Sequence, residues 1–394
     1  MSINLRNYIK HSTILSMFLE GVVMTMSTPV FSFDIKPFIF ISVLNSFILI
    51  FFNRILLQKN HIHVLLYILI SGLFLISNHE TEFFKQFVAI MFVSIYFYSC
   101  FRYVGAQELF SVYVRYAYYY AIFSIIYYYY KQLLYGYSFG AHGLMSEPSV
   151  YAIFMMPAFY YFLRERVEHR KRIILVIGGG ILLSGSSMGY LGIVISLFLV
   201  NTVSIKSWFK GLSLLVTSFI LFYSISSDFS SRINSTFDAL NSGSLPTVNT
   251  GSLITFALMS NYFVAMNVLK ENPILGNGLG SHSKSHEKYF SSIPGSGPWS
   301  EAGLDWMNKS DANSLGIRIA SEFGIIGIML VALFLWRNLK NVNYENRGII
   351  IGAFIYLILV IIRSGNYVAA DLYFFIFMIY FIGQRKQPIS RKEC

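Results

Sequence analysis

Long apolar stretches separated by short polar segments dominate the chain. Apolar runs of about 17–25 residues are long enough to cross the roughly 30 Å hydrocarbon core of a bilayer as helices. The runs lie at about 12–31, 37–53, 62–77, 84–102, 109–130, 149–164, 173–185, 187–205, 210–226, 313–336, 348–363 and 367–383. The stretch from Ile173 to Val203 is broken at Gly185, so we count it as two short helices that meet at a tight turn. The pattern predicts an all-α, polytopic membrane protein of about twelve transmembrane helices.

Composition supports this prediction. Of the 394 residues, 55% are hydrophobic and only 12% are charged, whereas soluble domains average about 25% charged residues. A soluble enzyme and a disordered chain are therefore excluded. The net charge of +11 comes from short basic clusters between apolar runs, which is typical of membrane topology rather than of nucleic-acid binding. Two cysteines, Cys100 and Cys394, provide neither a disulfide framework nor a thiolate metal site.

The basic residues also orient the spans. With twelve spans, 19 of the 30 lysines and arginines fall on one side and eight on the other. Cytoplasmic loops carry the excess of positive charge, so we expect both termini to be cytoplasmic.

One long polar segment, residues 227–312, interrupts this arrangement on the outer face. Its first part is rich in Ser, Asn and Gly, and residues 252–271 have apolar residues at helical spacing. We expect an amphipathic helix there, lying on the membrane or on the bundle. Residues 1–394 are then a single integral membrane domain, with 227–312 as its large outer loop.

Ionisable residues within spans are costly, so each is a functional candidate. Arg318 and Glu322 are four residues apart and share a helix face; they form either a site or a buried structural pair. Arg363 and Asp371, near the outer face, are open to the same two interpretations. Glu20 lies midway along the first run, with no evident partner in the sequence.

A second candidate cluster lies just before the run at 149–164. His142 and Glu147 precede Pro148, which fits the first turn of a helix. Glu147 is then either an acidic helix cap or a carboxylate held at the membrane boundary. The glycines of 276–280 lack the context of a nucleotide-binding loop and predict a turn.

Several segments together resemble the O-antigen polymerase/ligase superfamily. They are Glu147-Pro148-Ser149, Ser184–Gly189, Asn272–Ser281 and Asn313–Gly327, in that order around one long loop. Two departures matter. Asn313 stands where the ligases have a histidine, which favours a polymerase, and Met188 replaces an arginine frequent in the family.

The resemblance implies a GT-C-like fold and a glycosyl transfer that needs no metal or other cofactor, at the periplasmic face of the bacterial inner membrane. A growing glycan on undecaprenyl pyrophosphate would be transferred to the distal sugar hydroxyl of a lipid-linked repeat unit. The implied partners are these lipid-linked oligosaccharides and polysaccharides, membrane lipid and a chain-length regulator protein, with no nucleic acid. A ligase that transfers polymer to lipid A–core stays open. So does a lipid-linked-oligosaccharide flippase, although two similar halves are not evident.

This reaction needs a base for the acceptor hydroxyl and cations for the leaving pyrophosphate. Glu147 is the first candidate base, followed by Asp311 and His142, with Asp305 and His282 as further choices. Arginine suits phosphate because its planar fork binds two oxygens at once. The outer-face arginines are Arg318, Arg363 and Arg232, and we expect them to bind the pyrophosphate.

Overall fold

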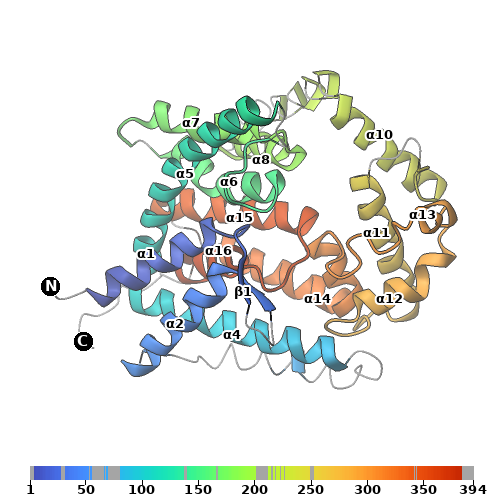
Figure 1. Ribbon diagram of the computed structural model, residues 1–394, viewed down its shortest axis with the longest axis horizontal. Coiled ribbons are helices and arrows are strands. Elements are labelled where there is room, and N and C mark those ends of the chain that lie inside the picture. The colour runs from blue at the N-terminus through green and yellow to red at the C-terminus, as the bar shows by residue number, and fades with distance from the viewer. Residues whose placement is uncertain are drawn as a thin grey trace.

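The structure, a computed structural model, is helical apart from one short hairpin (Figure 1). It describes residues 4–27, 32–52, 54–55, 66, 68–69, 80–136, 140–165, 167–200, 212–213, 216–217, 219–221, 223–225, 227–248, 253–340, 342 and 344–383. In the hairpin, β1 (Met24–Ser27) pairs antiparallel with β2 (Ser32–Ile35). The prediction of an α-helical membrane protein is thus supported at the level of its architecture.

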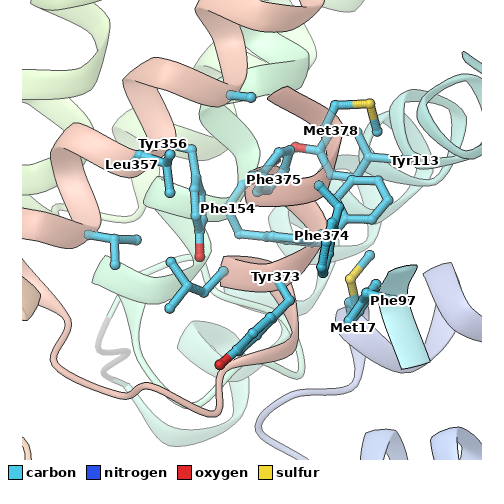
Figure 2. Close-up of a cluster of buried hydrophobic side chains, with 14 of the residues drawn as sticks. Met17, Phe97, Tyr113, Phe154, Tyr356, Leu357, Tyr373, Phe374, Phe375 and Met378 are labelled. Atoms are coloured by element: carbon cyan, nitrogen blue, oxygen red, sulfur yellow. Dashed lines mark hydrogen bonds between the residues drawn. The ribbon is translucent and has the colours of Figure 1, made fainter. Parts of the chain in front are cut away.

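One set of helices forms a bundle. Its members are α1 (Leu5–Phe18), α2 (Pro37–Phe51), α4 (Glu80–Val104), α5 (Ala106–Tyr135), α6 (Pro148–Arg164), α7 (Arg170–Leu183), α8 (Ser187–Val200), α14 (Leu315–Leu339), α15 (Arg347–Arg363) and α16 (Ala370–Gly383). The helix α6 packs against α7, α8 and α15. Large aromatic side chains fill the centre, with the rings of Tyr356 and Phe375 4.3 Å apart and Tyr113 against Phe374 (Figure 2). Such pairs add stability beyond the apolar area that they bury.

A second set of helices comes from the long segment 227–312 and lies on the side of the molecule opposite α1 and α2 (Figure 1). It comprises α10 (Ser227–Ser242), α11 (Leu253–Glu271), α12 (His282–Tyr289), the 3₁₀ turn η1 (Phe290–Ser292) and α13 (Gly297–Glu301). These elements have an apolar core of their own, in which Phe256 stacks on Trp299 at 3.9 Å. The Trp299 indole donates a hydrogen bond to the carbonyl of Pro246. The segment is therefore folded.

The helix α14 joins the two sets and is broken at Gly324, whose φ of 59° no other residue adopts as easily. Because of the break, the carbonyls of Ser321 and Glu322 accept hydrogen bonds from outside the helix. The donors are the backbone N–H groups of Asn277 and Gly278, at 2.9 and 2.8 Å. Residues 276–280 form turns, as predicted.

The segment 272–278 also binds α14 on the C-terminal side of the break at Gly324. The N–H groups of Ile325 and Ile326 donate to the carbonyls of Pro273 and Ile274. A Cβ on Gly276 would lie 2.5 Å from the Ser321 carbonyl oxygen, so the close approach requires glycine there. Irregular backbone at membrane depth is tolerated when protein satisfies its hydrogen bonds, and the segment 272–278 does this for α14.

Four helices of the described ranges are long and apolar enough to cross a membrane: Thr81–Val104, Ala106–Tyr135, Leu253–Glu271 and Leu315–Leu339. Shorter apolar helices are Pro37–Phe51, Ser187–Val200 and Ala370–Gly383. The helix predicted at 252–271 is therefore present as α11, packed on α14 and sufficiently apolar to span. The total of twelve spans stays a prediction, since the run 62–77 lies largely outside the described residues and the run 210–226 is described only in part.

The run at 12–31 is not a single helix, contrary to our expectation. The helix α1 ends at Phe18 and β1 begins at Met24. The chain turns between them because Glu20 and Gly21 bind another part of the protein: the Gly21 N–H donates to the carbonyl of Leu144 at 3.0 Å. Hydropathy alone could not reveal this contact.

Candidate functional site

The end of α15 and the start of α6 meet in an ion pair. Arg363 Nη2 lies 3.8 Å from Glu147 Oε2, and the side chains are 19% and 57% exposed. The Ser149 hydroxyl donates to the same carboxylate oxygen at 3.0 Å. Glu147 precedes α6 in an extended conformation, and its side chain makes no capping bond to the helix. The carboxylate predicted as the base is therefore available at the surface and faces a predicted phosphate-binding arginine.

Glu20 holds the segment that leads into Glu147. Its carboxylate accepts a hydrogen bond from Lys36 Nζ at 2.5 Å, and from the hydroxyl and N–H of Ser146 at 2.7 and 3.2 Å. Burial raises the pKa of Glu20, but these bonds outweigh it, so the pKa lies below its usual value. A Cβ on Gly21 would come 2.4 Å from the backbone of Met145, which shows how tightly the two segments pack. Glu20, for which the sequence offered no evident partner, is therefore paired with Lys36 and Ser146.

Arg318 is held on every side. Its Nε donates to Glu322 Oε1 at 3.2 Å, Nη1 to the carbonyl of Gly365 at 2.7 Å and Nη2 to Gln86 Oε1 at 2.6 Å. The guanidinium also lies 4.3 Å from the centre of the Tyr367 ring, a favourable cation–π distance. The prediction that Arg318 and Glu322 share a face is confirmed, and both side chains are almost fully buried.

A cavity of about 310 Å³ opens beside Arg318. Its lining residues are Gln86, Ser310, Asp311, Arg318, Asn366, Tyr367 and Val368. Asp311 Oδ1 accepts hydrogen bonds from the Asn308 amide and from the N–H of Asn313. A Cβ on Gly365 would overlap the Asp311 carbonyl oxygen, so only glycine allows this approach. The cavity thus lies between α4, the end of the long segment 227–312 and the connection from α15 to α16.

Arg232 brings a third arginine to the area. It lies on α10, and its Nη1 donates to the hydroxyl of Ser187, the first residue of α8, at 2.8 Å. Arg232, Glu147 and Asp311 all act electrostatically on Arg363, and Asp311 also acts on Arg318. Three predicted site residues, Glu147, Arg232 and Arg363, therefore gather around the end of α15. Asp311 links them to the cavity beside Arg318.

Other candidates lie elsewhere. The His142 ring bonds to the carbonyl of Gly140 at 2.8 Å, its own carbonyl accepts from the Tyr120 hydroxyl, and it does not line the cavity. Asp371 interacts with Tyr356. Since Arg363 pairs with Glu147, the structural pair considered for Arg363 and Asp371 is not formed.

His282 is buried between α11 and α14. The Asn261 amide donates to the Ala257 carbonyl, so its oxygen accepts from His282 Nε2 at 2.8 Å, and Nδ1 accepts from the Ser321 hydroxyl at 2.7 Å. Burial, with the nearby cations, lowers the pKa of His282 to about 3. This histidine is a structural part of the α11–α14 contact rather than an accessible base.

The sequence did not identify Gln86, Asn366 and Tyr367 as cavity residues. They are uncharged, and Gln86 is 232 positions from Arg318, the residue that it binds. The only available hint was the polar Ser364-Gly365-Asn366 break between two apolar runs. Among the described residues, no group of three or more His, Cys, Asp or Glu side chains is placed to hold a metal ion.

Comparison with known proteins identifies no relative: no family model matches the chain, and no curated protein is significantly similar to it.

Proposed function

We propose that this protein is a membrane glycosyltransferase of the polysaccharide-polymerase type. It would transfer a growing glycan from undecaprenyl pyrophosphate to the distal sugar hydroxyl of a lipid-linked repeat unit, at the periplasmic face of a bacterial inner membrane. The observation that carries the proposal is the surface ion pair of Glu147 and Arg363, with Arg232 within electrostatic range. A carboxylate beside arginines is the combination that this transfer needs.

In this proposal each group has one task. Glu147 accepts the proton of the acceptor hydroxyl while the hydroxyl oxygen forms the new bond to the sugar carbon. The bond from that carbon to the pyrophosphate breaks, and its electron pair leaves with the phosphate. Arg363 and Arg232 stabilise the charge that develops there. Arg363 suits this task because its ion-pair contact with Glu147, at 3.8 Å, is long, so it can reorient toward a phosphate.

Asn313 supports a polymerase over a ligase. By the sequence resemblance, it stands where the ligases have a histidine. In the structure it is 1% exposed, and neither the oxygen nor the nitrogen of its amide has a hydrogen-bond partner among the described residues. A buried amide cannot act as a base.

The nature of the surface polysaccharide made without this protein tests the proposal. In a deletion strain, a polymerase defect leaves one repeat unit on the lipid core, whereas a ligase defect leaves bare core and accumulated lipid-linked polymer. A flippase defect traps repeat units on the cytoplasmic leaflet. We expect the first result, with long chains restored by the wild-type gene. Either of the other results contradicts the proposal.

A further inference from the structure

The cavity beside Arg318 differs from the surroundings of Arg363 in its charge. Arg318 contributes one positive charge, but Glu322 neutralises it at 3.2 Å, and Asp311 lines the cavity with a negative charge. The formal charge of these three groups is therefore −1. A phosphate or an acidic sugar would meet net repulsion from these three groups.

The hydrogen-bonding groups of the cavity fit a different ligand. Asn366 Oδ1 accepts from the N–H of Val368, and its amide N–H groups have no partner among the described residues. Asp311 uses Oδ1 for its two bonds, which leaves Oδ2 as an acceptor. Ser310 adds a hydroxyl, and Val368 adds an apolar wall. Sugar hydroxyls both donate and accept hydrogen bonds, and the C–H groups of a sugar ring need an apolar contact.

The size and position of the cavity agree with this ligand. Its volume of about 310 Å³ is at the lower end of the range for small-molecule sites. The cavity lies near Arg363, because Arg318 binds the carbonyl of Gly365, two residues after Arg363, and Asp311 acts electrostatically on both arginines. A ligand in the cavity would therefore lie next to a pyrophosphate bound at Arg363.

We propose that the cavity lined by Gln86, Asp311, Arg318 and Asn366 is a subsite for an uncharged sugar of the lipid-linked repeat unit, distinct from the pyrophosphate subsite at Arg363 and Arg232. The inference rests on the proposed function and adds to it a selection against acidic sugars at this position.

Two lipids can distinguish the two subsites in a binding assay. One is undecaprenyl pyrophosphate without sugar, and the other is the repeat-unit lipid extracted from the deletion strain. Binding of each is measured to the full-length protein in nanodiscs. We expect Asn366→Ala to weaken binding of the repeat-unit lipid about 5-fold, the effect of one lost neutral hydrogen bond, without changing binding of the sugar-free lipid. Arg363→Ala is expected to weaken binding of both lipids.

Asn366→Asp adds a charge at the same place. The carboxylate retains the bond to the N–H of Val368 but lacks the amide N–H donors. We therefore expect the repeat-unit lipid to bind about 5-fold more weakly, as it does to the Ala variant, and the affinity for the sugar-free lipid to stay within about 3-fold of the wild type. Lys85→Ala, on the exposed surface of α4 next to Gln86, is the matched control and should change neither affinity.

Two results would overturn the inference while leaving the proposed function intact. If Asn366→Asp weakens binding of the sugar-free lipid tenfold or more, the cavity holds phosphate. If both Asn366 variants bind the repeat-unit lipid as tightly as the wild type does, the cavity holds no part of this lipid. Absence of binding of either lipid to the wild type contradicts the proposed function itself.

Discussion

Arg318 and Arg363 are both arginines at the ends of apolar runs, yet their surroundings differ in almost every respect. Arg318 is 5% exposed and bonded to three partners, one of them the fully buried Glu322. Arg363 is 19% exposed and has a carboxylate partner, Glu147, at 3.8 Å. From the sequence, both arginines were predicted to bind the pyrophosphate, because both are expected near the outer face of the membrane. The contacts suggest that Arg318 organises the protein and that Arg363 meets the substrate.

The difference has a physical basis. A buried charge is tolerated only when it is paired and hydrogen-bonded, so the bonds of Arg318 are a condition of its burial. A phosphate ligand needs donors that are free when it arrives. Of the two arginines, Arg363 meets this requirement better. Each prediction below perturbs one side of the comparison and leaves the other intact.

The largest effect is expected on the Arg363 side. Glu147→Gln should lower the turnover of purified repeat-unit lipid by about 10²–10⁴-fold, the usual contribution of a general base, while lipid binding is retained. Polymer length on gels and initial rates measure it. Ser149→Ala removes only the neighbouring hydrogen bond and is the control. Near-normal turnover of the Gln variant would remove Glu147 from the chemistry and make Asp311 the next candidate.

On the Arg318 side we expect loss of stability. Arg318→Ala leaves the Glu322 carboxylate buried without its ion-pair partner, which costs about 3–5 kcal/mol. The melting temperature in detergent should fall steeply. The double variant Arg318→Met with Glu322→Leu removes both charges and should recover most of the loss. If the single variant melts like the wild type, the pair does not stabilise the protein.

Arg363→Ala should reverse this pattern. We expect an activity loss of about 10²–10³-fold, as for removal of a group that stabilises developing charge, with a melting temperature close to that of the wild type. Arg363→Lys should recover only part of the activity, because an ammonium group cannot reproduce bidentate contacts. An inactive but unstable Ala variant would assign Arg363 a structural role.

The smallest effect is a pH dependence on the Arg318 side. Burial lowers the pKa of His282 to about 3 and that of His286 to about 4. Unfolded histidines take up protons near pH 6.5, so stability is lost as the pH falls below that value. From pH 7.5 to 5.5 the loss is about 1.4 kcal/mol for each histidine, measurable by denaturant titration. His286→Phe keeps the stacking on Phe290 and should halve the loss.

Sequence reasoning succeeded where interactions are local. Apolar runs predicted most helices to within a few residues, and the spacing of Arg318 and Glu322 predicted their contact. It was wrong at 12–31, where Ser146 and Leu144, in the segment before α6, bind Glu20 and Gly21. Glu147 and Arg363 were selected separately, but their pairing depends on how α6 and α15 pack. Gln86 and Asn366 carry no charge, and only the folded chain identifies them as cavity residues.

The break in α14 also determines where the chain can be modified. Four backbone hydrogen bonds connect residues 273–278 to α14, two at each end of the segment. One residue added or removed between Ile274 and Asn277 would put the two pairs out of register with each other, so the length of the segment is constrained. Gly243 and Ser244, by contrast, form a turn directly after α10, and Gly243 is exposed. An epitope tag or a fluorescent label for following the protein in cells therefore belongs at Gly243, and any library of loop variants should keep 273–278 at its native length.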